Sequence, residues 1–408
     1  MKCGSDSTVT PYPLRKDMSR FRLIVVFLAI VCSNNLLFGQ AEEEPLAAPD
    51  ANVLAADRWR EVDGAVQRGL TWLAKQQKED GSFESLAAGQ PAVTSLCLMA
   101  FLAQGESPAN GQYQKQLAVA IDFIADQQKP NGLIGMRAPG AVPIPRKGVL
   151  NHLNASSVYN HAISALALSE AYGQCTPDQA KRLSPIIEKA IAATLEMQGW
   201  GGKKKENVGG WRYLSLKPGG DSDLSITGWQ LMFLRSAKNA GFDVPKKNID
   251  AAVTYVENCF LQDQGNQGVH AYVVGQPFAC TRGMAGAGVL AMAHAGKHDS
   301  KEALASGEWI LKHDFSNYND DAPTYGVASC EEHYHYASFL CSQAMFQLGG
   351  KYWKQFYPPL VETLLANQQE DGAWPPESSA RRYGNCYSTS LCILSMSVPN
   401  QMLPILQR

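Results

Sequence analysis

The chain of 408 residues has almost no net charge and lacks several common functional motifs. Its 36 Lys and Arg residues nearly balance 38 Asp and Glu residues, which gives a formal net charge of −2. A nucleic-acid-binding domain normally has a clear basic excess, so nucleic acid is not an expected partner. The sequence contains neither a phosphate-cradling glycine loop nor the Gly-x-Ser-x-Gly turn that carries a catalytic serine. Functions that depend on those two motifs are therefore excluded.

The N-terminal apolar run is too short to span a bilayer. It covers 23–32, follows the basic segment 18–22 and precedes small residues at 39–41. This pattern is typical of a cleaved secretory signal. We interpret 1–41 as an upstream extension plus a signal peptide, with Met18 as the true start. The mature protein is expected to be exported, periplasmic or extracellular, with no transmembrane anchor after cleavage.

The cysteines do not form the pattern of a small disulfide scaffold. Of ten in the chain, those beyond residue 41 are widely spaced, and several fall on apolar helical faces. Buried free thiols are the expectation, because Cys readily fills core positions. Pairing of some of them in an oxidising compartment is the alternative.

A repeated unit dominates the rest of the chain. A helix ends in Gln, a Gly-aromatic turn follows, and a second helix rich in small residues comes next. Residues 77–83 read QKEDGSF, 368–374 read QQEDGAW, and 127–133 are a diverged copy, QQKPNGL. Self-similarity at this period indicates a repeat architecture.

The repeat predicts six helix pairs. They are 62–77 with 92–104, 117–128 with 157–172, 186–197 with 225–240, 249–260 with 281–295, 301–313 with 333–348, and 357–369 with 387–398. The first helix of each pair is amphipathic and the second is apolar nearly all round, as in a fully buried helix. We predict an all-α fold in which second helices form an inner ring and first helices an outer ring.

The predicted domain organisation follows from these boundaries. Residues 42–60 are acidic and rich in Pro and Ala, and are expected to be a flexible linker. Residues 61–400 form the repeat domain, and 401–408 a C-terminal tail. A closed ring of about six hairpins needs no polar end caps, unlike an open solenoid.

The Gln-x-x-Asp-Gly-x-aromatic units resemble the QW motif of squalene–hopene cyclases. The chain, over 62–398, looks like a member of the α/α-toroid superfamily of terpenoid cyclases and protein prenyltransferases, which includes prenyltransferase and squalene oxidase repeat proteins. The resemblance implies that Gln77, Phe83, Gln368 and Trp374 tie helix ends together. It also implies that functional groups lie at the starts of the inner helices. The fold alone does not specify an activity.

Two acidic residues precede the third inner helix. Asp221-Ser222-Asp223 resembles the Asp-x-Asp-Asp-Thr-Ala motif with which squalene–hopene cyclases protonate their substrate, although Leu224 replaces one acidic residue. The resemblance implies catalytic roles for Asp221 and Asp223. Such an acid needs a dry cavity and neighbours that stabilise its anion. The alternative is that these residues cap the helix.

A metal site is a further hypothesis. Cys386-Tyr387-Ser388 resembles part of the zinc signature of protein prenyltransferases, with Gly384 in place of the expected Asp. The resemblance implies a zinc ion on His335, Cys386 and a third ligand, either Cys330 or His333. The alternative is a packed His-Tyr cluster with Cys386 buried and no cofactor required.

Polar and aromatic residues near the inner-helix starts are the predicted ligand-binding set: His161, Trp211, Trp229, Arg282, His335, Tyr336 and Tyr387. Polar groups that converge on an aromatic cavity are typical of a binding site, and aromatic faces stabilise cations. The alternative is ordinary core, with the polar groups satisfied by hydrogen bonds.

Three functional hypotheses remain. The protein binds or transforms an apolar, isoprenoid-like ligand in a central cavity, and as an enzyme it would be cyclase-like or prenyltransferase-like with incomplete motifs. Alternatively, it is a non-catalytic scaffold for a protein or glycan partner in the cell envelope. A polysaccharide-active enzyme would need clustered acidic and basic residues in an open groove, and the inner helices offer few.

Overall fold

The computed structural model describes residues 46–135, 149–214, 221–262, 268–276, 280–320 and 332–408. The predicted signal peptide, with Met18, lies outside the described residues, and so does Cys330. Among the described helices, none combines the length and apolar composition needed to cross a bilayer.

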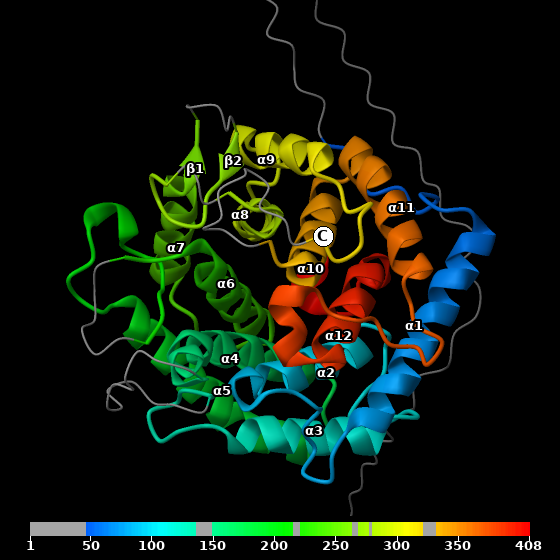
Figure 1. The fold of residues 1–408 in the computed structure, drawn as a ribbon. Coiled ribbons are helices and arrows are strands. Elements are labelled where there is room, and N and C mark those ends of the chain that lie inside the picture. The colour runs from blue at the N-terminus through cyan, green and yellow to red at the C-terminus, as the bar shows by residue number, and fades with distance from the viewer. Residues whose placement is uncertain (1–45, 136–148, 215–220, 263–267, 277–279, 321–331) are drawn as a thin grey trace, which may run out of the picture. The chain divides into compact units, whose positions relative to one another are not determined.

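The described residues form two concentric rings of α-helices (Figure 1). The outer helices are α1 (Ala56–Gln76), α3 (Gln114–Asp126), α5 (Pro177–Gln198), α7 (Lys246–Asn258), α9 (Lys301–Lys312) and α11 (Gly350–Ala366). The inner helices are α2 (Ala92–Leu102), α4 (Val149–Tyr172), α6 (Leu224–Asn239), α8 (Arg282–His294), α10 (Tyr334–Leu348) and α12 (Asn385–Met396). All six predicted pairs, and the all-α toroid that they imply, are confirmed.

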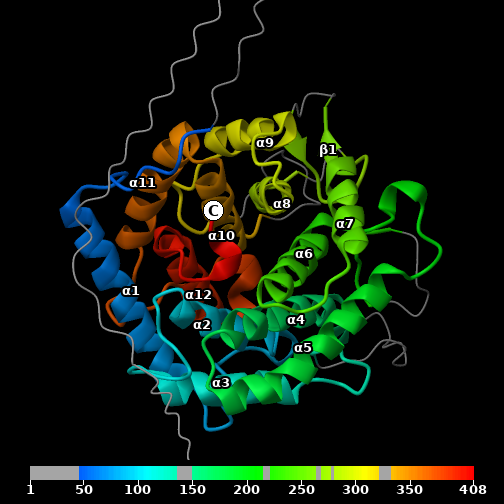
Figure 2. The ribbon, with the colours of Figure 1, turned by 180° about the vertical axis from the view of Figure 1, so that it is seen from behind.

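The inner ring is closed. Each inner helix packs against the next, and α12 packs against α2 (Figure 2). Every residue of α2 is buried, as expected for a helix with neighbours on all sides. Small residues allow close approach: a Cβ on Gly286 of α8 would lie 2.9 Å from the backbone nitrogen of Cys341 on α10.

The outer helices bury one face each. On α1, the residues Val62, Val66, Leu70 and Leu73 are buried, at the spacing of a single helical stripe. Helices α5 and α11 begin earlier than predicted and contain Pro185 and Pro358–Pro359 in their interiors. Proline usually breaks a helix, which is why the sequence pattern placed these starts too late.

The glutamine of the repeat joins neighbouring outer helices. Gln77 Nε2 donates to Gly81 O in its own turn (3.1 Å) and to Gln116 O on the next outer helix (2.8 Å). Gln128, Gln198 and Gln368 each make the same pair of hydrogen bonds, one within their own turn and one to the next outer helix. The structural role implied for Gln77 and Gln368 is thus seen directly.

The turn glycine lets these elements come together. Gly81 has φ +87°, and a Cβ there would lie 2.2 Å from Val119 O on α3. Only glycine tolerates both the left-handed backbone and this contact. The aromatic two residues later is tied to the inner helix, because Phe83 N donates to Thr94 Oγ1 (3.0 Å).

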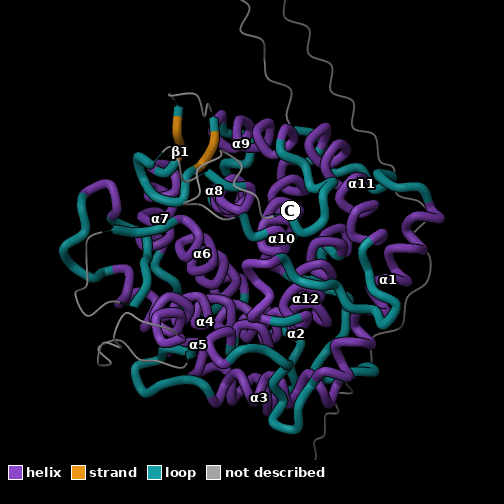
Figure 3. Tube along the Cα trace, viewed as in Figure 1, coloured by secondary structure: helices purple, strands orange, loops and turns teal. Residues whose placement is uncertain are grey.

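The described chain outside the two rings includes one small sheet and a packed C-terminal segment. Strands β1 (Phe260–Leu261) and β2 (Val269–His270) form an antiparallel pair between α7 and α8 (Figure 3). The predicted tail, 401–408, is packed rather than free: Leu403, Ile405 and Leu406 are buried, and Gln347 Nε2 donates to Leu406 O. At the other end, α1 begins at Ala56, inside the predicted linker.

Candidate functional site

A cavity of about 530 Å³ lies where the N-terminal parts of the inner helices meet. All six inner helices contribute to its wall. The aromatic part consists of Tyr159, Tyr213, Trp229, Tyr272, Tyr336, Tyr383 and Tyr387. The aliphatic part includes Val93, Leu96, Ile163, Met284 and Leu391. Closure of the ring thus brings side chains from six distant segments around one space.

A buried ion pair stands behind one side of the wall. Asp223 is fully buried, and its Oδ1 accepts hydrogen bonds from Ile226 N (2.8 Å) and Ser225 Oγ (2.7 Å). Its Oδ2 accepts from Arg212 Nη1 (2.8 Å). Burial raises the pKa of Asp223, although Arg212 and the hydrogen bonds oppose that effect. Asp223 is therefore the N-cap of α6, the role that the sequence offered as the alternative.

The tyrosine hydroxyls on this side form hydrogen bonds with other protein groups. Tyr272 OH accepts from Arg212 Nη1 (2.9 Å) and lies 2.6 Å from Tyr213 OH. The Tyr159 hydroxyl is hydrogen-bonded to Ser225. The Arg212 guanidinium also lies 4.5 Å from the Tyr213 ring centre. Burial raises the pKa of Tyr159 and Tyr213, and the nearby Asp223 charge adds to it, so both phenols stay neutral.

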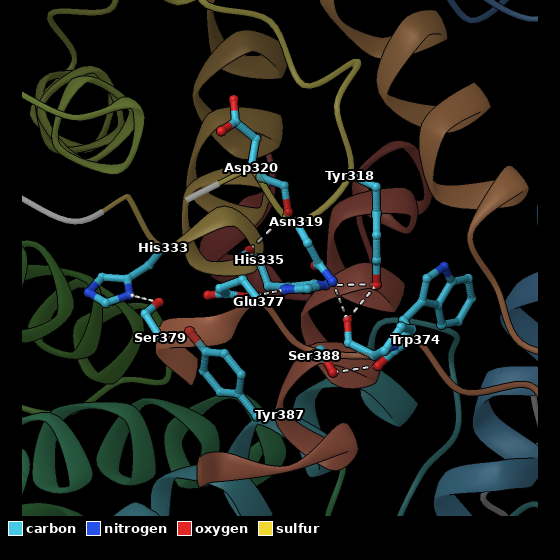
Figure 4. Close-up of polar contacts among 12 residues, drawn as sticks. Tyr318, Asn319, Asp320, His333, His335, Trp374, Glu377, Ser379, Tyr387 and Ser388 are labelled. Atoms are coloured by element: carbon cyan, nitrogen blue, oxygen red, sulfur yellow. Dashed lines mark hydrogen bonds and ion pairs between the residues drawn. The ribbon is translucent and has the colours of Figure 1, made fainter. Parts of the chain in front are cut away.

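A second buried cluster stands behind the α10–α12 side (Figure 4). His335 Nδ1 is hydrogen-bonded to Glu377 Oε2, and His335 Nε2 lies 3.1 Å from Tyr318 OH. Tyr318 OH donates to Pro375 O at 2.8 Å. Burial raises the pKa of Glu377, but the hydrogen bond and charge of His335 outweigh it, so the pKa is lowered. Glu377 is thus held as a carboxylate inside the protein.

These contacts do not fit the predicted zinc site. Both ring nitrogens of His335 have protein partners, and Cys386 lies beside Cys97, whose Sγ is 3.7 Å from Cys386 O. Cys330 is outside the described residues. Within the described part of the chain, no group of three His, Cys, Asp or Glu residues is arranged to hold a metal. Burial raises the pKa of the Cys97 thiol, which keeps it protonated.

The predicted ligand-binding residues fall into two groups. Trp229, Tyr336 and Tyr387 line the cavity. Arg282 and His335 lie outside the lining, and Arg282 is held by Glu332 (Nε to Oε2, 3.7 Å) and by Asp314 O and Asp320 O.

His161 and Trp211, also outside the lining, belong to the repeat. Trp211 N donates to Thr227 Oγ1 (3.1 Å), and its Nε1 donates to Thr194 O (2.9 Å). His161 takes the place of that threonine in the second hairpin, since Ile134 N donates to His161 Nδ1 (3.0 Å). Burial lowers the pKa of His161 to about 3, so the imidazole is neutral and can accept. Asp221 is half-exposed and lies 3.6 Å from Arg212 Nε.

Several residues of the site escaped the sequence analysis. Tyr159 and Tyr383 line the cavity, and Arg212 and Glu377 stand behind its wall. Tyr159 was recognisable, because it directly precedes Asn160-His161 at the phase of an inner-helix start. Glu377 had no such signal. It lies in the connection after Trp374, where the repeat does not constrain which residue types occur.

Comparison with known proteins supports the fold. The chain matches no family model and no curated protein sequence. It is similar in structure to type II terpene cyclase MstE from Scytonema, with TM-score 0.52 and 12% identity over 84% of this chain and 99% of that one. It is also similar to cellobiose 2-epimerase from Bacillus thermoamylovorans B4167, with TM-score 0.55 and 13% identity over 84% and 98%. A glycosidase gives TM-score 0.54 and 9% identity over 86% and 100%.

These likenesses, together with the closed double ring and its central cavity, define the class. The chain has a terpenoid cyclase-like α/α-toroid fold. Neighbours with this fold include a terpene cyclase and carbohydrate-active enzymes, so the fold by itself leaves the ligand open.

Proposed function

We propose that this protein is exported and binds an apolar, isoprenoid-like molecule in the central cavity. The observation that carries the proposal is the chemistry of the wall: aromatic rings and aliphatic side chains from all six inner helices surround about 530 Å³. This volume lies within the usual range for a small-molecule site, and such sites are mainly apolar.

The cavity wall also includes polar residues, among them Glu332, His333 and Arg382 near its α10–α12 side. On the Arg212 side, the direction of the polar groups favours an apolar ligand over a sugar. The hydroxyls of Tyr159, Tyr213 and Tyr272 are hydrogen-bonded within the protein, so their rings rather than their polar ends are available to a ligand. Asn160 Nδ2 likewise donates to Ala88 O at 3.0 Å. A sugar needs many hydrogen bonds to replace those it makes with water, whereas an apolar chain needs contact area.

The neighbours are compatible with an apolar ligand without deciding the question. One MstE structure is a complex with geranylgeranyl dihydroxybenzoate, and one glycosidase structure is a complex with glucose. The wall of the present cavity favours the first kind of ligand. Export is supported by the N-terminal sequence alone.

Native mass spectrometry of the mature protein, purified under gentle conditions, tests the proposal. We expect a co-purifying mass that organic solvent extracts and that proves to be a lipid or terpenoid. Metal analysis of the same sample tests the zinc hypothesis independently. A bound oligosaccharide, or a protein with no bound mass that also fails to bind added isoprenoids, would contradict the proposal and favour a scaffold role.

A further inference from the structure

One buried carboxylate oxygen near the cavity has no hydrogen-bond partner in the part of the chain that the structure describes. Glu377 is fully buried, and its Oε1 makes no hydrogen bond within the described residues. Its other oxygen, Oε2, is bonded to His335. An unpartnered carboxylate oxygen inside a protein is costly, so a hydrogen-bond donor is expected beside it.

The free oxygen faces the cavity side of the cluster. Figure 4 shows it directed away from His335, toward the side on which His333, Ser379 and Tyr387 lie. His333 and Tyr387 are part of the cavity wall, and Ala380 of the same wall follows Glu377 in the 3₁₀ turn Ser378–Tyr383. Burial raises the pKa of Tyr387, and the charge of Glu377 raises it further, so this phenol stays neutral and can donate.

His335 stabilises the carboxylate form of Glu377. Because Tyr318 OH gives its hydrogen to Pro375 O, His335 Nε2 is left to donate to the Tyr318 oxygen. Nδ1 faces a carboxylate and also donates. The hydrogen bond and charge of His335 lower the pKa of Glu377 and so keep it a carboxylate. A carboxylate is a strong hydrogen-bond acceptor, and His335 beside it reduces the need for a cationic ligand.

We propose that Glu377 Oε1 accepts a hydrogen bond from a hydroxyl group of the cavity ligand, so that the ligand is an isoprenoid alcohol rather than a hydrocarbon. This inference rests on the proposed function. The ligand oxygen lies between Glu377 Oε1 and the Tyr387 hydroxyl, donating to the first and accepting from the second. Glu377 lies just outside the cavity lining, so in this proposal the partly buried Tyr387, which is part of the lining, turns to admit the group.

Three probes with one carbon skeleton test the site on the mature protein: farnesol, its methyl ether, which has no donor, and the hydrocarbon farnesene. Dissociation constants are measured by calorimetry. We expect farnesol to bind about tenfold more tightly than the other two, the scale of one hydrogen bond to a charged acceptor. Equal binding of all three would overturn this inference and leave the cavity proposal standing. Failure of farnesene and farnesol alike would instead overturn the cavity proposal.

Substitutions at Glu377 and Tyr387 test whether Glu377 is the group that accepts the hydrogen bond from the ligand hydroxyl. In Glu377→Gln the amide oxygen can remain on His335, which puts an NH₂ donor in place of Oε1. The advantage of farnesol over its ether should then fall to within about twofold, with farnesene binding unchanged. Tyr387→Phe should lower the farnesol advantage by about threefold. Glu170→Gln, at a buried carboxyl group outside the cavity wall, should leave it unchanged. A Glu377→Gln or Tyr387→Phe protein that keeps the full advantage would overturn the assignment.

Discussion

The side-chain amide of Gln368 donates to the backbone carbonyl of Ala65 at 2.8 Å and so joins the last outer helix to the first. The same amide donates to Gly372 O in its own turn at 2.9 Å. Because four repeat glutamines make this pair of bonds, one residue type links most of the outer ring. The link through Gln368 is the one that closes the ring.

Replacement of Gln368 by Leu should therefore weaken the whole domain. Two buried carbonyls lose their donor, and we expect a loss of about 2 kcal/mol in the free energy of unfolding, measured by urea denaturation. Gln369→Leu is the matched control, because that neighbouring side chain is exposed and should change stability by less than about 0.5 kcal/mol. Equal effects of the two substitutions would contradict the closing role of Gln368.

Gly81, the glycine of the first repeat turn, should tolerate substitution as poorly as Gln368. Gly81→Ala would put a Cβ 2.2 Å from Val119 O on a backbone with φ +87°, so we expect a loss of at least about 2 kcal/mol. Gly173→Ala provides the control, since nothing lies within 4 Å of its added Cβ. Thermal unfolding of both variants checks this. A Gly81→Ala protein as stable as Gly173→Ala would show that the turn relaxes freely.

The repeat shows how far sequence reasoning reaches in this protein. Gln77, Gly81 and Phe83 recur at fixed spacing because each serves local backbone geometry that every hairpin shares, so their roles were predictable. His161 was not, because it replaces the threonine of other hairpins with a different acceptor. Glu377 and Arg212 were not either. Glu377 pairs with His335 of the preceding hairpin, and Arg212 joins Asp223 of its own hairpin to Tyr272 of the next, so no periodic constraint fixes their positions.

Substitution of the two acidic residues before α6 should change the stability of the protein to different extents. Asp223 is fully buried against Arg212, whereas the Asp221 side chain is 51% exposed. Asp223→Asn keeps a capping side chain but leaves Arg212 without its closest anion, which should cost about 2–3 kcal/mol. Asp221→Asn should cost less than about 0.5 kcal/mol. If urea denaturation gave both variants the stability of the unmodified protein, the Asp223–Arg212 ion pair would not contribute to the stability of the fold.

Glu170 should make stability depend on pH. Burial raises its pKa from 4.5 to about 7, although bonds from Ser236 and from Ile405 N oppose the rise. The folded state therefore holds this proton more tightly than the unfolded state. The resulting stability is fully present below pH 4.5 and is lost as the pH rises through 7, by about 3 kcal/mol in all.

Glu170→Gln removes this dependence, because the amide stays neutral at every pH. The difference in unfolding free energy between the variant and the unmodified protein should shift in favour of the variant between pH 5 and pH 8. Glu196→Gln, on the exposed side of α5, should show no such trend. Parallel pH profiles for the unmodified protein and Glu170→Gln would mean that Glu170 is not protonated in the folded state.

The most direct test of the central claim is binding of farnesene to a protein whose cavity has been filled. Val93 lies in the cavity wall and is 2% exposed, while Val119 on α3 is 41% exposed. Calorimetry should show that Val93→Trp weakens farnesene binding by at least about tenfold and that Val119→Trp leaves it unchanged. Circular dichroism confirms that both variants are folded. Undiminished binding by a folded Val93→Trp protein, or no binding by the unmodified protein, would contradict a ligand site in the centre of the ring.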